Sequence, residues 1–463
     1  RNGIVRRASI NSHNFLGSII NLKKTLSETL TINAGADVRS YKGIHYRRLD
    51  HLLGADGYRD FDSANYPTGS GDTAGSIVRR KTYSSNLGKQ WNVFKDTDDE
   101  EKIDYHNDGL VRWMGVFGQL QYKKDAIALF AQASVSSQGF QRVEYFNQVG
   151  TATSDWKTIR GGNVKAGANF NLNAKSNIYV NGGYYSKQPN FDAVYINYSN
   201  TLNPDLKNET VTGFEMGYGY NSGKLKLNAN VYLTTWKDRF LSDGVTVVNK
   251  NYDPSAAPGT PNSEKTLRGT ANYYGIEQIH SGLELDAKFD LSSFVSVQGM
   301  LSLGNYEYGS DVKAEVFDSS RQPIGDANLF LNGVKVGDAA QTTSRLNLEV
   351  RPTDLFKFNV SMFSASDLFA NFNPEDFDTD GDQAMMLPAY ELFDFGASYN
   401  LSIAGEMVYV RLNVNNLFDN AYISESSTNI MANPGDPTFL GVNTDNRAFP
   451  GWGRSWNLGF TYR

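Results

Sequence analysis

Residues Lys224–Leu233 read KLKLNANVYL, and every second side chain of this run is apolar. Met407–Val414 (MVYVRLNV) repeats the pattern, with Arg411 and Asn413 between the apolar positions. A period of two sustained over about ten residues is the signature of a β-strand with one apolar and one polar face. These stretches predict a fold built from long amphipathic strands.

The composition of the 463-residue chain supports an all-β fold. Aromatic residues make up 13% of it, and it contains 43 glycines but only 13 prolines. Many aromatics and few prolines favour strands over a set of helical domains. Cysteine is absent, which excludes a disulfide framework, thiolate zinc sites and thiol catalysis.

Charge and hydropathy restrict the partners of the protein. Lysine and arginine number 44 against 50 acidic residues, so no basic excess is present to neutralise a nucleic-acid backbone. The longest unbroken apolar run, Ala126–Ala131, is far shorter than the roughly 20 residues of a membrane-spanning helix. A helical membrane protein is therefore excluded, whereas a β-barrel is not.

Strand length and spacing favour a transmembrane antiparallel β-barrel over its alternative, a soluble β-sandwich. The expected strands are about 10–18 residues long, and aromatics gather near their ends, as at a membrane interface. Short turns are expected at Thr25–Glu28, Lys123–Asp125, Asn173–Ser176, Asn221–Gly223, Asp290–Ser293, Arg351–Asp354 and Ser402–Glu406. Long connections are expected at about residues 48–108, 147–155, 189–206, 241–269, 309–339, 370–388 and 419–452. Short turns that alternate with long loops are typical of outer-membrane barrels.

Seven turns and seven long connections imply about fifteen strands. Bacterial single-chain barrels have an even number of strands, and an open sheet edge cannot face lipid. We therefore expect residues 1–463 to be the C-terminal portion of one larger barrel domain. In a barrel of 22 strands, seven would come from outside this chain.

Several motifs resemble those of TonB-dependent outer-membrane receptors. Asn415–Tyr422 (NNLFDNAY) is similar to the penultimate-strand signature of that family, and it follows Leu387–Tyr399 (LPAYELFDFGASY). Gly453–Tyr462 (GRSWNLGFTY) resembles the closing strand. Upstream matches are Asn203–Glu209 (NPDLKNE), Gly213–Gly217 (GFEMG) and His280–Leu285 (HSGLEL). Together they cover Asn177 to Arg463, and the acidic loops and Tyr/Asn-rich strands suggest the Bacteroidetes branch.

The resemblance implies a receptor in the bacterial outer membrane that takes up a siderophore, glycan, peptide or cobalamin. Energy would come from the TonB complex of the inner membrane, through a plug and a TonB-contacting box that this chain does not contain. A surface lipoprotein lid is an expected partner of a glycan or peptide importer. No catalytic motif is present, so an enzyme is not expected. The alternatives are a receptor-like barrel that serves as an assembly subunit, a passive porin and a soluble adhesin.

The family motif and the charged strand residues have expected roles. Asn416 and Asp419 should fix the exit from strand to loop by bonding to local backbone, with Leu417 and Phe418 at the outer interface. Four charged residues are candidates to face the barrel interior, where they could pair with a plug: Glu215, Glu284, Arg345 and Arg411.

One acidic segment resembles the first half of a calcium-binding loop. Asp376–Asp382 (DFDTDGD) places carboxylates at Asp376, Asp378, Asp380 and Asp382, with Gly381 at the sixth position. The twelfth position is Leu387 rather than the usual glutamate, so Ca²⁺ would need further ligands. A solvated acidic loop is the alternative.

Aromatic residues with polar neighbours in the long connections are candidates to stack on a ligand. They are Trp91, Trp156, Tyr195 and Tyr198. Anchoring at the membrane interface is the competing interpretation of such residues.

Overall fold

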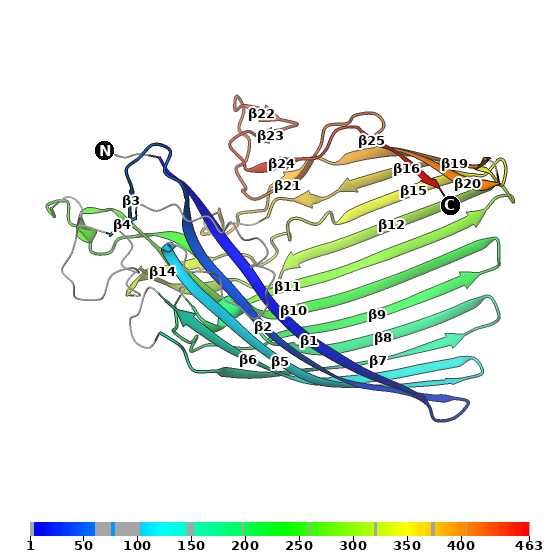
Figure 1. The fold of residues 1–463 in the computed structure, drawn as a ribbon, viewed down its shortest axis with the longest axis horizontal. Coiled ribbons are helices and arrows are strands. Elements are labelled where there is room, and N and C mark those ends of the chain that lie inside the picture. Colours follow the sequence, from blue (N-terminus) through cyan, green and yellow to red (C-terminus); the bar gives the residue numbers. More distant parts are fainter. Residues whose placement is uncertain are drawn as a thin grey trace. The chain divides into compact units, whose positions relative to one another are not determined.

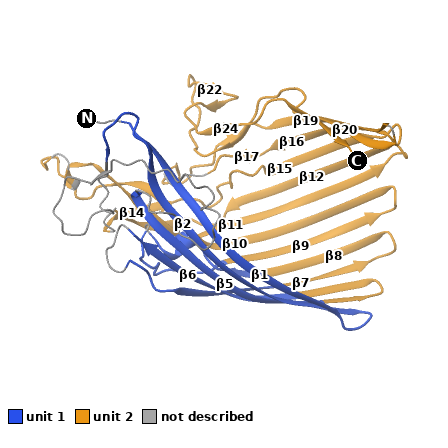
Figure 2. Cartoon of the chain, viewed as in Figure 1, with its two compact units in different colours: residues 1–120, 132–164, 185–209 blue, residues 121–131, 165–184, 210–463 orange. Residues whose placement is uncertain are grey.

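The computed structural model describes residues 4–60, 76–78, 102–145, 152–196, 199–257, 260–318, 322–371, 376–403 and 405–462. The chain forms two compact units (Figure 2). Unit 1 comprises Arg1–Leu120, Gln132–Val164 and Tyr185–Glu209. Unit 2 comprises Gln121–Ala131, Lys165–Tyr184 and Thr210–Arg463.

The all-β prediction is confirmed. Across the described residues the helical segments longer than one residue are α2 (Phe191–Val194) and the 3-10 turn Pro261–Ser263. None of the described helices is both long and apolar enough to cross a membrane.

Unit 1 is built on a long hairpin of β1 (Arg6–Thr25) and β2 (Leu30–His51), which pair antiparallel along almost their whole length. β2 also pairs with β5 (Lys102–Lys124). The unit further contains parts of β6 (Ile127–Glu144), β7 (Lys157–Asn171) and β8 (Ser176–Lys187). A short pair, β3 (Tyr58–Asp60) with β4 (Ser76–Val78), lies in the connection after β2.

Unit 2 is an antiparallel meander, in which strands that follow one another in the chain pair with one another (Figure 1). It runs through β9 (Glu209–Asn221), β10 (Leu225–Val248), β11 (Thr266–Asp290), β12 (Val295–Tyr308), β15 (Thr342–Val350), β16 (Phe356–Ser366), β19 (Tyr390–Ile403), β20 (Glu406–Asn415) and β25 (Ser455–Tyr462). β12 pairs directly with β15. The intervening β13 (Val312–Phe317) and β14 (Pro323–Leu329) form a hairpin of their own, and β13 also pairs with β11.

The seven short turns lie where the sequence predicts them. β9 ends at Asn221 and β10 begins at Leu225, for example, and Gly223 between them has a φ of 87°. Such a positive φ suits glycine, which lacks a Cβ. In the turn after β7, the Asn173 side-chain oxygen accepts hydrogen bonds from the backbone of Lys175 and Ser176. Local side-chain chemistry therefore fixes these hairpins.

The strands of unit 2 have one strongly apolar, solvent-accessible face. Large side chains on this face are exposed to an extent that a soluble protein would avoid: Phe214 and Met216 are each 52% exposed, and Leu346 is 50% exposed. The alternate residues, which form the opposite face, are mainly Asn, Tyr, Glu and Gly. The two faces are called here the apolar face and the polar face.

The strands extend further than the alternation predicted. β10 reaches Val248 and β11 begins at Thr266, so both enter the connection expected at residues 241–269. Two further long connections have short paired strands. β17 (Leu368–Phe369) pairs with β18 (Met386–Leu387) at the connection expected at residues 370–388, and within residues 419–452 the pairs are β21 (Ile423–Ser426) with β24 (Ala448–Pro450) and β22 (Thr438–Phe439) with β23 (Val442–Asn443).

Among the residues that the structure describes, three hydrophobic cores hold parts of the long connections together. In unit 2, the hairpin module, defined as β13, β14 and the adjoining ends of β10 and β11, surrounds Val316, Leu329 and Phe377, none of which is exposed. The closing loop, residues 416–454, packs Ile423 and Val442 against Leu368 and Leu387. In unit 1, a third core contains Phe140, Val194 and Tyr195.

Candidate functional site

On the polar face of unit 2, two glutamates share a network of amide and phenol groups. Asn230 on β10 donates to Glu215 on β9 at 3.3 Å and to Glu284 on β11 at 3.2 Å. Two residues of β8 also donate to the Glu215 carboxylate: Asn181 at 3.0 Å and Tyr179 at 3.4 Å. Each carboxylate is therefore held by neutral donors, and the face is rich in hydrogen-bonding groups.

Tyrosine rings lie over glycines on this face. The Tyr179 ring covers Gly217, and the Tyr232 ring covers Gly282. The Tyr232 and Tyr306 hydroxyls are 2.7 Å apart, and the His280 ring stacks on Tyr306 with 4.8 Å between ring centroids. Glycine is required at these positions because a Cβ would overlap the ring.

The two arginines expected on this face lie on other strands. Arg345 on β15 is exposed and donates to the Ser361 hydroxyl on β16 at 3.4 Å. Arg411 on β20 is exposed and lies opposite Ser398 on β19. The structure therefore places both as side chains that solvent can reach.

The family motif connects the ends of three strands. Asn416 has a φ of 50° and is 4% exposed. Its side chain donates to the carbonyls of Asn420 and Trp452 and accepts from the Asn420 amide, while its own amide donates to Asp394. Asp419 accepts a hydrogen bond from the Arg454 amide at 2.6 Å. Both side chains thus bond to backbone where β20 becomes the closing loop.

The two apolar residues of the motif lie between these anchors. Phe418 is 63% exposed and packs edge-on against Phe393 on β19. The Leu417 amide donates to the Phe393 carbonyl at 2.6 Å.

The acidic segment is anchored by its one aromatic residue. Phe377 is fully buried in the hairpin module, and its carbonyl accepts a hydrogen bond from the Phe330 amide at 2.9 Å. Asp378, Asp380 and Asp382 are exposed, and Gly381 has a φ of 98°. Within the described residues, no group of three or more His, Asp or Glu side chains is arranged to hold a metal. Calcium binding by Asp376, Asp378, Asp380 and Asp382 stays a prediction from the residue pattern.

Two of the predicted ligand-contacting aromatics have structural partners in unit 1. Tyr195 is 3% exposed; its hydroxyl accepts from Ser154 and can donate to the Phe140 carbonyl at 3.1 Å. Burial raises the pKa of the Tyr195 phenol. The Arg112 guanidinium lies 4.1 Å from the centre of the Trp156 ring. Trp91 and Tyr198 lie outside the described residues.

Unit 1 also contains charged clusters that the sequence did not reveal. Asp104 forms ion pairs with Arg7 and Arg47 at 2.6 and 2.7 Å, and it accepts from the Tyr58 hydroxyl. Arg142 and Glu144 form a buried ion pair at 2.8 Å. The partners of Asp104 are 46 or more residues away in sequence, and only the fold brings them together, since Arg7 lies on β1, Arg47 on β2 and Tyr58 on β3.

Comparison with known proteins identifies the kind of barrel. Residues 4–417 match the family model described as TonB dependent receptor-like, beta-barrel. The comparison with curated proteins finds no match.

Solved structures show the same fold. The copper transporter OprC is 13% identical to this chain, and the two superpose with a TM-score of 0.61. The alignment covers 99% of this chain and 58% of OprC. For the ferric citrate transporter FecA in its unliganded form, the identity is 13% and the TM-score 0.60, and the alignment covers 100% of this chain and 56% of FecA. For the siderophore receptor PiuA from Acinetobacter baumannii, the identity is 14% and the TM-score 0.59, and the alignment covers 98% of this chain and 56% of PiuA. At these identities the likeness concerns the fold, and the chain spans just over half the length of each relative.

Proposed function

The chain belongs to the TonB-dependent receptor β-barrel family, whose members reside in the outer membrane of Gram-negative bacteria, and on this basis we propose that the protein is an outer-membrane transporter. It takes up a large or scarce ligand with energy from the TonB complex of the inner membrane. The match of the family model to residues 4–417 is the observation that carries this proposal.

The two faces of the strands support a membrane barrel. The apolar face contacts lipid, and the polar face, with Glu215, Glu284 and their amide partners, lines the interior. Fifteen described strands are at least eight residues long. We propose that further strands from outside this chain complete an even-numbered barrel, with a plug domain inside it.

Capture of the ligand belongs to the long connections. Their small cores hold them in defined conformations, which reduces the entropy lost when a ligand binds. The ligand class stays open among ferric siderophores, other metal chelates, glycans, peptides and cobalamin. OprC, FecA and PiuA carry copper, ferric citrate or siderophores by name, so metal chelates are the first class to test. A surface lipoprotein lid is proposed only for a glycan or peptide ligand.

Uptake in the native host tests the proposal. The gene would be deleted, and uptake of ⁵⁵Fe-labelled ferric citrate, ferric catechol chelates, labelled cobalamin, oligosaccharides and peptides would be compared with the parent strain. We expect one class to lose uptake, to regain it on complementation, and to lose it again when TonB is inactivated.

A different outcome would favour the assembly subunit. If every uptake rate is unchanged by the deletion but a larger outer-membrane complex falls apart on native gels, the transporter proposal is wrong. Unchanged uptake in the TonB-inactive strain would instead indicate a passive pore.

A further inference from the structure

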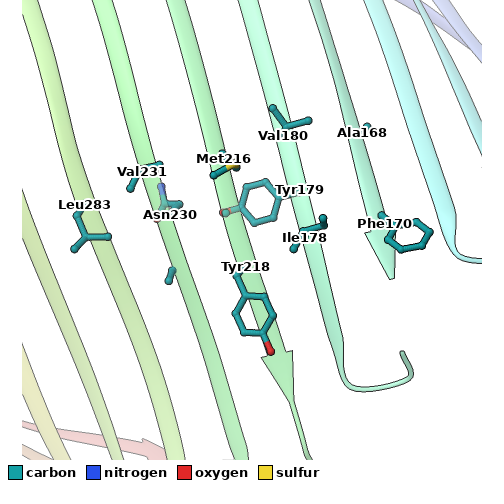
Figure 3. A pocket seen from close by; sticks show the side chains of 12 residues that line it. Ala168, Phe170, Ile178, Tyr179, Val180, Met216, Tyr218, Asn230, Val231 and Leu283 are labelled. Atoms are coloured by element: carbon teal, nitrogen blue, oxygen red, sulfur yellow. The ribbon is translucent and has the colours of Figure 1, made fainter. Parts of the chain in front are cut away.

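A hollow of about 640 Å³ opens among strands β7 to β11 in unit 2 (Figure 3). Its walls are large side chains of the apolar face: Phe170, Ile178, Val180, Met216, Tyr218 and Val231. Two small residues also line it, Ala168 on β7 and Ala229 on β10. Ala229 is paired with Tyr218 across β9 and β10, so the gap lies beside a tyrosine ring.

The hollow lies toward the short-turn end of the strands. Phe170 is one residue before the end of β7, and Ile178 is the third residue of β8. Val231, near its other limit, is the seventh residue of β10. The lining spans three residues of a strand, Ala229–Val231 in the case of β10. At about 3.4 Å per residue and a strand tilt near 45°, Val231 lies roughly 14 Å from the short-turn end of β10, which is close to the thickness of one leaflet in a hydrocarbon core about 30 Å thick.

Exposed lysines stand in the turns directly below the hollow. Lys175 lies in the turn between β7 and β8, and its carbonyl accepts a hydrogen bond from the Asn221 amide at 2.7 Å. Lys224 lies in the next turn, and its carbonyl accepts from the Asp290 amide at 2.9 Å. The Asp290 carboxylate on that side pairs with Lys288 at 3.6 Å. Both turn lysines are exposed and can reach toward the membrane surface.

We propose that this hollow and its two lysines form a binding site for a single phospholipid with an anionic headgroup. One acyl chain lies in the hollow against Ala229, and the phosphate lies near Lys175 and Lys224. Short turns of outer-membrane barrels face the periplasm, so the occupant is a phospholipid of the periplasmic leaflet. The site depends on the membrane location of the family and not on which ligand is transported.

Two properties distinguish this site from the general lipid contact of the apolar face. The apolar face is hollowed here, beside Ala168 on β7 and Ala229 on β10, with β8 and β9 between them. The cationic groups also stand at the end where a headgroup would lie, which gives charge complementarity to a phosphate.

Native mass spectrometry of the whole protein tests this site. The protein would be purified in detergent, stripped of lipid and titrated with phosphatidylglycerol or with phosphatidylethanolamine of the same two C16 chains. We expect one phosphatidylglycerol to bind before any phosphatidylethanolamine. Ala229→Phe, which fills the hollow, should abolish this first binding event. Lys175→Gln with Lys224→Gln should weaken it roughly 25-fold, at about fivefold per lysine.

Matched variants make the test decisive. Ala287→Phe adds the same ring to the apolar face of β11 outside the hollow, and Lys313→Gln removes a lysine from β13 in the hairpin module. Both should leave phosphatidylglycerol binding unchanged. Equal binding by Ala229→Phe and Ala287→Phe would overturn the proposal, as would a dimer that Ala229→Phe dissociates. The lysine variants change only exposed side chains, so they remain informative if Ala229→Phe fails to assemble.

Discussion

At the residue scale, Asn416 illustrates what holds a strand end in place. Its side chain satisfies three backbone groups of the closing loop while its own backbone lies in the left-handed region. Asparagine tolerates that conformation better than most residues, and its amide both donates and accepts. An acid at this position would lack the two donated bonds.

We expect Asn416→Ala to lower the free energy of unfolding by about 2–3 kcal/mol, because buried backbone groups lose their partners. The apparent unfolding temperature of the whole protein in detergent measures this. Asn415→Ala is the control, since Asn415 makes one exposed bond of 3.3 Å to Ser455. Equal losses in the two variants would refute the role given to Asn416.

Asp338, in the connection between β12 and β15, should make that segment sensitive to pH. Burial raises the pKa of its carboxyl, and the nearby Glu425 carboxylate raises it further. The folded state therefore holds the proton more tightly than the unfolded state. The segment is most stable below the ordinary aspartate pKa and loses stability as pH rises through the raised pKa.

Hydrogen exchange at the Asp338 amide, which donates to the Phe369 carbonyl at 3.1 Å, reports this loss. After correction for intrinsic exchange, we expect protection to fall with rising pH in the wild type but not in Asp338→Asn. Glu425→Gln should show a smaller fall. The same pH dependence in Asp338→Asn as in the wild type would show that another group titrates.

At the element scale, glycines allow tyrosines to lie flat on the polar face. A side chain at Gly217 in β9 would displace the Tyr179 ring and its bond to Glu215. We expect Gly217→Val to cost about 1–3 kcal/mol of stability through overpacking, measured by thermal unfolding in detergent.

Gly299→Ala in β12 is the matched control. The nearest atoms to a Cβ at Gly299 are 3.9 Å away, and alanine loses less chain entropy on folding than glycine. This variant should unfold at the wild-type temperature or slightly above it. A loss as large as that of Gly217→Val would mean that glycine itself, and not the ring contact, matters in these strands.

Phe377 should be the residue on which the hairpin module depends. We expect Phe377→Ala to cost about 3–5 kcal/mol, because it empties a space inside a small core. Hydrogen exchange should increase in β13 and at the Phe330 amide but not in β16. Asp378→Asn, an exposed neighbour, should change neither, and unaltered protection of β13 in Phe377→Ala would contradict the assignment.

The sequence predicted strands better than it predicted their ends. In β10 the alternation is clear from Leu225 to Leu233, but the pairing with β11 shifts between Trp236 and Leu241, and Asp238 there has a φ of 57°. A bulge interrupts the period of two, so Val245 and Val247 resemble loop residues in the sequence. Both are in fact buried in the hairpin module.

At the scale of the whole molecule, the apolar face determines where the protein can reside. Leu346→Arg would place a charge among exposed apolar side chains of β15, whereas Asn347→Arg would place it on the polar face beside the natural Arg345. We expect only Leu346→Arg to reduce assembly, at a cost of about 1–3 kcal/mol. The folded fraction in outer-membrane preparations, resolved by heat modifiability on gels, measures the difference. Equal yields would imply that this part of β15 does not contact lipid.

The candidate site was only partly predictable because its contacts are long-range. Glycine neighbours and the alternation selected Glu215 and Glu284 from the sequence. The bridging role of Asn230 depends on the register of β10 with both β9 and β11, which no local pattern specifies. The partners of Asp104 were missed for the same reason.

The meander also has a consequence for the order in which the chain folds. Every short turn closes a hairpin over only a few residues, so little loop-closure entropy opposes it, whereas the long connections must close over many more. The pairs β1–β2, β9–β10, β11–β12, β15–β16 and β19–β20 should therefore form early, each as an independent nucleus. The hairpins then join through pairings such as β10–β11 and β16–β19. β12–β15 should be among the slowest of these to form, because the whole β13–β14 hairpin lies within its loop.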